Sequence, residues 1–175
     1  FCLSRGLGDV YKRQDKYDYM KNFNTNNKRE IAKTVAVFSA FTEGLQLFAS
    51  FAILLNFPRF NKMKGMGQIV TWSVRDETLH CNSMIKIFNT FCDENPGLLD
   101  ESLKKEIYDA CRTIVHHEDA FIDLAFEMGN IEGLTAQQVK EYIRWIANRR
   151  LSQLRLNEIY EVKENPLTWL DDMLN

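Results

Sequence analysis

VAVFSAFTEGLQLFASFAILLNF, residues 35–57, is a nearly unbroken apolar segment, and it decides the fold of this chain. We expect it to lie in one helix over about 27–56, with Asn26 or Asn27 as the N-cap and an end before Pro58. About 20 apolar residues suffice to span a bilayer, but Glu43 lies near the middle of the segment, where a charge is costly. The segment therefore predicts the central helix of a soluble bundle, with a membrane or interaction module as the alternative.

The rest of the chain continues the helical pattern. Three further helices are predicted: from near Gly65–Gln68 to the residue before Pro96, from about Asp100 to Gly129, and from Thr135 to about Leu154. Thr135 and Gln138 have the spacing of a capping box, and Asp100 is a good N-cap. No stretch alternates with period two for long enough to form a strand. The predicted fold class is therefore all-α.

Composition limits the functional classes. The chain has 175 residues, of which 45% are hydrophobic, so it can bury a real core. Its 22 Lys and Arg residues against 24 Asp and Glu residues leave no basic excess for a nucleic-acid groove. The four cysteines show no CxxC or CxxH spacing, which favours reduced core residues in a cytoplasmic protein over a zinc or redox site. We expect neither a nucleic-acid nor a membrane partner.

The two ends of the chain differ from the rest. Residues 1–14, FCLSRGLGDVYKRQ, are polar and lack both helical periodicity and the apolar core of a signal peptide. We interpret them as a non-native or processing-derived segment, and residues 15–175 as part of one helical domain. The chain ends within an apolar pattern, which indicates a piece of a longer protein.

Glu43 raises the question of a buried carboxylate. It lies on a helical stripe that is otherwise apolar apart from one serine: Ala36, Ala40, Glu43, Leu47, Ser50 and Leu54. Glutamate is almost never fully buried unless it is paired or bound to a metal. Taken alone, Glu43 is best interpreted as a structural glutamate that hydrogen-bonds a neighbouring helix.

The next helix supplies two partners for Glu43. Glu77 and His80, in the sequence RDETLH of residues 75–80, are three residues apart and project from one face of a helix. Residue 60 is the midpoint both of the predicted turn and of the pair Glu43 and Glu77, so an antiparallel hairpin places both carboxylates at the same depth. Each lies about 25 Å from the turn at about 1.5 Å per residue. Because two buried carboxylates repel each other, this arrangement predicts a bound metal ion. It is half of the pattern of dimetal-carboxylate bundles.

These residues, with Glu43–Ala52 (EGLQLFASFA) and Met63–Met66, resemble the small, radical-generating subunit of class I ribonucleotide reductase. The resemblance covers about residues 15–175 and corresponds to the second half of that subunit's ferritin-like bundle. By position it implies that Glu43, Glu77 and His80 are metal ligands. It also implies that Asp76 is an outer carboxylate that links a metal-bound histidine to a tryptophan, both in the missing half. Leu47 departs from the family, where many members have phenylalanine.

The resemblance implies a function for the intact protein. A dinuclear centre, of Fe/Fe, Mn/Fe or Mn/Mn, reacts with dioxygen and yields a one-electron oxidant, stored in most members as a tyrosyl radical. The oxidant passes to a cysteine of the large subunit, where a ribonucleoside diphosphate is reduced to supply deoxyribonucleotides for DNA replication. A homodimer of small subunits is implied as well. The radical tyrosine and the tail that docks on the large subunit are absent from this chain.

Some charged residues are not expected to take part. His116, His117, Glu118 and Asp119 look like a ligand cluster, but we interpret them as a solvated helix surface. Arg149 and Arg150, together with Arg144 and Arg155, are interpreted as a solvated face with ion-pair partners in Glu141 and Glu158.

The enzymatic alternative is a related ferritin-like dimetal oxidase that acts on a small or fatty substrate. The missing helices would discriminate, because a redox tyrosine and a docking tail belong to the reductase. With three of six expected ligands, this piece alone is expected to bind metal weakly and to lack reductase activity.

Overall fold

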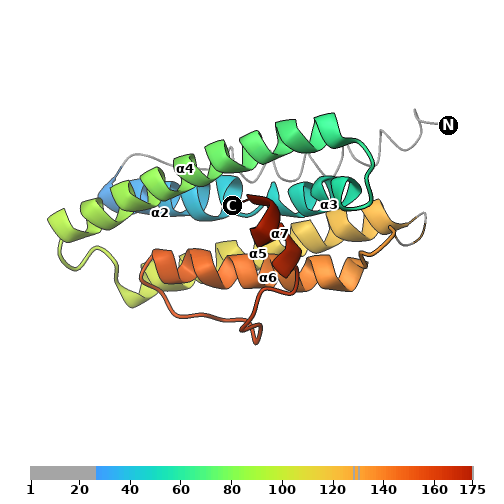
Figure 1. The fold of residues 1–175 in the computed structure, drawn as a ribbon. Helices are drawn as coiled ribbons and strands as arrows, with labels where there is room; N and C mark the ends of the chain where they lie inside the picture. Colours follow the sequence, from blue (N-terminus) through green and yellow to red (C-terminus); the bar gives the residue numbers. More distant parts are fainter. Residues whose placement is uncertain (1–26, 128, 130, 175) are drawn as a thin grey trace, which may run out of the picture.

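The apolar segment forms the central rod of a helical bundle (Figure 1). The computed structural model describes residues 27–127, 129 and 131–174. The described elements are α2 (Lys28–Ala36), the π-helix η1 (Val37–Glu43), α3 (Phe48–Arg59), α4 (Lys64–Glu94), α5 (Glu101–Phe126), α6 (Ala136–Gln153) and α7 (Thr168–Leu174). Within these residues, the β-type pairing is limited to one isolated bridge between Ile131 and Leu134. The predicted all-α fold is confirmed.

The rod α2–η1–α3 contacts α4 on one side and the pair α5 and α6 on the other. α4 runs antiparallel to the rod, as the hairpin prediction required. Large side chains with almost no exposed surface fill the space between these layers, among them Phe41, Leu45, Leu55, Phe88, Ile107, Ile114, Ile122 and Ile143. Full burial of each such side chain contributes about 1.5–3 kcal/mol. The rod is therefore held in place from both sides.

The prediction of one continuous helix over 27–56 is wrong in its middle. The α-helix changes to π-helical geometry at Val37, and a turn at residues 44–47 follows before α3 begins at Phe48. The amide of Gln46 donates to the carbonyl of Phe41 at 3.1 Å, an i→i+5 bond of the π type. Wider turns of this kind are frequently found at functional sites.

The interruption also changes which residues face the core. Up to Glu43, the stripe positions Ala36 and Ala40 are buried, as predicted. Beyond Glu43, the buried residues include Leu45, Phe48, Ala49, Ala52, Leu55 and Asn56, whereas Leu47 is 39% exposed. The predicted stripe is therefore wrong beyond Glu43, because the wider turn rotates the later residues relative to an ideal helix.

The helix ends agree with their sequence signals, with two exceptions. Asp100 accepts from the amide of Leu103 at 2.7 Å, and the capping box of α6 is complete. α3, however, continues through Pro58 to Arg59, because the proline lies in the last turn and its ring packs on α4, against Gly67. α5 ends at Phe126, three residues before the predicted Gly129. The short helix α7 was not predicted.

Two surfaces bear on the membrane alternative. Lys28–Arg59 is long and apolar enough to cross a bilayer, but half of its most apolar window is buried inside the bundle. The exposed apolar side chains lie instead mainly on α4, where Ile69, Trp72, Leu79 and Ile87 are each more than half exposed.

The segment of residues 1–14, which the sequence analysis interprets as non-native or processing-derived, lies outside the described residues.

Candidate metal centre

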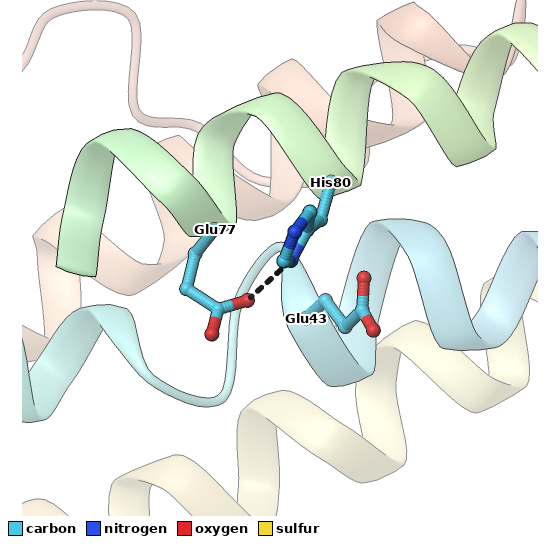
Figure 2. A group of neighbouring side chains, drawn as sticks. All are labelled: Glu43, Glu77 and His80. Carbon is cyan, nitrogen blue, oxygen red and sulfur yellow. Dashed lines mark ion pairs between the residues drawn. The ribbon is translucent and has the colours of Figure 1, made fainter.

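Glu43, Glu77 and His80 come together where η1 lies against α4 (Figure 2). One donor atom from each side chain lies within 4.8 Å of the other two. Glu43 is the last residue of η1, and Glu77 and His80 lie one turn apart on α4. Figure 2 shows the imidazole of His80 between the two carboxylates. The structure therefore brings together the three residues that the hairpin geometry predicted to meet.

The environment of Glu43 fits that of a metal ligand. Its Oε2 is buried and has no hydrogen-bond partner among the described residues. A buried ionised carboxylate oxygen is costly unless a hydrogen bond or a cation compensates it. In the same turn, Thr42 Oγ1 and Gln46 Nε2 are also buried without a partner in the described part of the chain. The end of η1 and the turn after it therefore carry a group of buried polar atoms whose hydrogen-bonding or metal-binding partners lie outside the described residues.

The three polar side chains of α4 at this site differ in how far they are exposed to solvent. The side chains of Glu77, His80 and Asp76 are 27%, 51% and 69% exposed. His80 Nδ1 lies 3.9 Å from Glu77 Oε2, and His80 Nε2 lies 3.7 Å from Asp76 Oδ1. Both distances are longer than a hydrogen bond. The Nδ1 side of the ring therefore faces Glu77, and the Nε2 side faces the outer carboxylate Asp76.

The donor set fits a hard or borderline metal ion. Two carboxylates and one imidazole suit iron or manganese, and the two elements are not distinguished by these donors. The centre lies between the core and the apolar face of α4, so one side of it is open. Three donors leave several coordination positions unfilled, which is consistent with half of a dinuclear site.

The sequence interpretation of residues 116–119 is partly wrong. His116 is exposed, as expected, and His117 is half-buried. Glu118, however, is fully buried on α5. Asp119 forms a two-pronged ion pair with Arg144 of α6 at 2.7 and 2.9 Å, rather than facing water. The cause is the close packing of α5 against α6, which the pattern of one helix does not show.

The predicted solvated arginine face is also corrected. Arg149 is exposed and lies over the ring of Trp145 at 4.7 Å, but Arg150 is only 5% exposed. Arg144 pairs with Asp119 and Arg155 with Asp93, not with Glu141 and Glu158. The helical spacing could have indicated the burial of Arg150. It lies three and four residues after Ala147 and Ile146 and directly before Leu151, which places it on the apolar side of α6.

The three cysteines within the described residues agree with the prediction of reduced core residues, and Cys2 lies outside those residues. Cys81, Cys92 and Cys111 are free thiols, and Cys81 and Cys111 are buried. Burial raises the pKa of the Cys81 thiol, and it raises the pKa of Cys111 to about 12. These thiols are therefore protonated and unreactive at neutral pH.

Comparison with known proteins identifies the family. The family model for "Ribonucleotide reductase, small chain" matches residues 7–166. A probable ribonucleoside-diphosphate reductase small subunit of Invertebrate iridescent virus 3 is 52% identical over 83% of this chain and 39% of its own length. The ribonucleoside-diphosphate reductase subunit beta of Chlamydia pneumoniae is 31% identical over 83% of this chain and 42% of its own length. The chain thus spans about two fifths of these relatives.

Solved structures share the fold. A putative class I ribonucleotide reductase from Bacillus halodurans superposes with a TM-score of 0.79 at 24% identity, covering 98% of this chain and 59% of its own. Dimanganese(II)-NrdF from Streptococcus sanguinis gives a TM-score of 0.77 at 20% identity, covering 94% and 56%. The ferritin-like architecture is therefore confirmed. On the family match and the viral and bacterial relatives, this chain belongs to the ribonucleotide reductase small-chain family.

Proposed function

We propose that the full-length protein is the small subunit of a ribonucleoside-diphosphate reductase, and that this chain provides one half of its dinuclear metal centre. In this role Glu43, Glu77 and His80 hold the metal, and Asp76 is an outer carboxylate on the route of electron transfer. The observation that carries the proposal is the convergence of three donor atoms within 4.8 Å around a buried, unpartnered Glu43 oxygen. The family match gives that cluster its chemical context.

When bound, the metal pair supplies the one-electron oxidation that generates the radical for ribonucleotide reduction. The protein's own residues fix the donors. Glu43 is fixed by η1 and by the packing of Phe41 and Leu45 in the core. Glu77 and His80 are fixed by α4, which Cys81 and Phe88 anchor against the core. A carboxylate at Asp76 faces His80 Nε2 and can orient the imidazole by its charge.

The open side of the centre supports a site completed by other parts of the subunit. Ile69, Trp72 and Leu79 expose apolar surface on α4, the helix that carries His80, and such surface marks a site of contact with another protein segment. The remaining ligands of the dinuclear site would come from that segment. The homodimer, the large-subunit partner and the cytoplasmic location are part of the same proposal, and the small chains of this family are soluble proteins.

Metal binding by the full-length subunit tests the proposal. We expect Glu77→Gln to lower the affinity for Fe(II) or Mn(II) by more than the 10- to 100-fold that loss of an outer partner costs. Glu94→Gln is the matched control, because Glu94 lies on the same helix and is exposed. Titration of the metal-free protein, with metal content measured by mass spectrometry, gives both values. Two metal ions bound by Glu77→Gln with unchanged affinity would contradict the proposal.

A further inference from the structure

Arg150 is a buried cation close to the candidate metal centre. Its side chain is 5% exposed, and within the described residues no carboxylate lies at ion-pair distance from its guanidinium. Burial lowers the pKa of this arginine. A charge removed from water in this way is costly unless hydrogen bonds compensate it. The hydrogen-bond partners of Arg150 therefore indicate its role.

The first partner is the residue that follows Glu43. Arg150 Nε donates to the carbonyl oxygen of Gly44 at 2.9 Å. In a continuous α-helix that carbonyl would accept from the amide of Phe48, but Phe48 donates to Leu45 instead, at 3.0 Å. Arg150 thus replaces a backbone hydrogen bond at the junction between η1 and α3. Its guanidinium also lies 5.3 Å from the ring centre of Phe48, the first residue of α3.

The second partner connects the same guanidinium to α4. Arg150 Nη1 donates to Gln153 Oε1 at 2.9 Å, and Gln153 Nε2 donates to Asn82 Oδ1 at 3.3 Å. Asn82 lies two residues after His80. The side-chain amide of Asn89, about two helix turns further along α4, donates to the carbonyl of Gln153 at 3.0 Å. Hydrogen bonds from one buried arginine therefore reach both segments that carry the candidate ligands.

We propose that Arg150 is a positioning residue for the metal centre, which holds the junction after Glu43 in register with the His80 turn of α4. The inference rests on the proposed function, since it takes Glu43 and His80 as ligands. Among the described residues, Arg150 forms no hydrogen bond or ion pair with a candidate ligand side chain. It acts through Gly44 on one side and through Gln153 and Asn82 on the other, and it keeps the π-helical end of η1 from closing into a regular α-helix.

The test compares Arg150→Met with Arg149→Met in the full-length subunit. Methionine preserves much of the length of the side chain and removes its hydrogen bonds, and the neighbouring Arg149 is exposed. Co(II) added to the metal-free protein reports ligand geometry through its visible spectrum. Hydrogen exchange of the amides at residues 44–50, also without metal, reports the junction itself. We expect Arg150→Met to weaken Co(II) binding about tenfold or more, the scale of an outer partner. We also expect it to change the spectrum and to speed exchange, whereas Arg149→Met behaves as wild type.

Each other result has a definite meaning. If Arg150→Met speeds exchange but leaves Co(II) affinity and spectrum unchanged, Arg150 is only structural and the inference fails, while loss of binding in Glu77→Gln keeps the proposed function intact. If Glu77→Gln retains wild-type binding, the proposed function fails and the inference with it. If Arg150→Met does not fold, Arg150→Lys retains the cation. A folded Lys variant must then show a shifted Co(II) spectrum, and failure of both variants to fold overturns the positioning role.

Discussion

Gly44 is the position where the smallest change should have the clearest effect on the site. A Cβ atom at Gly44 would lie 2.5 Å from the carbonyl oxygen of Ala40, and 2.8 Å from both Arg150 Nε and Cys81 Sγ. The Ala40 carbonyl belongs to η1 and cannot retreat without moving that helix. Overpacking of this kind costs about 1–3 kcal/mol. We therefore expect Gly44→Ala to destabilise the protein although alanine is the better helix former.

Gly65→Ala is the matched control. Gly65 lies in the first turn of α4, and a Cβ atom there meets nothing within 4 Å. Alanine in a helix interior is favoured over glycine by about 0.5–1 kcal/mol, so the control should be neutral or stabilised. Urea unfolding of the metal-free full-length subunit, followed by circular dichroism, measures both changes. Equal stability of the two variants would refute the argument, because the Gly44 junction would then have room for a side chain.

Three further predictions concern other parts of the bundle. Asn148 is 2% exposed and accepts from two backbone amides of the segment before α7, so Asn148→Ala should cost about 2 kcal/mol or more in urea unfolding. The pKa of the Glu106 carboxyl is lowered below its ordinary 4.5, mainly by a hydrogen bond from Lys33 and next by one from an arginine. Its contribution to stability is therefore complete above that pH and is lost as the pH falls through the lowered pKa, so Glu106→Gln should flatten the stability profile in acid. Cys111 should resist a thiol reagent at pH 8 until the protein unfolds, whereas the less buried Cys92 should react first, as read by mass spectrometry of the peptides.

The sequence determined the fold class and the depth of the candidate site. A helix that is apolar on all sides, such as the one predicted for residues 35–57, has to be buried by other helices, and this predicted a helical bundle. Glu43, Glu77 and His80 were found because a helical hairpin links index to depth, and the turn position was readable from the sequence. Their role as ligands remains a proposal, as does that of Asp76.

Only the tertiary structure showed the π-helix, the burial of Glu118 and the burial of Arg150. A hydrophobic pattern reports the average preference of a residue, and arginine prefers water. Arg150 is buried because the carbonyl of Gly44, more than one hundred residues earlier, lacks its usual amide donor. The predicted ion-pair partners of Arg144 and Arg155 were wrong because their actual partners, Asp119 and Asp93, lie on other helices. Which polar groups meet depends on how separate helices pack, and a single helix contains no information about its neighbours.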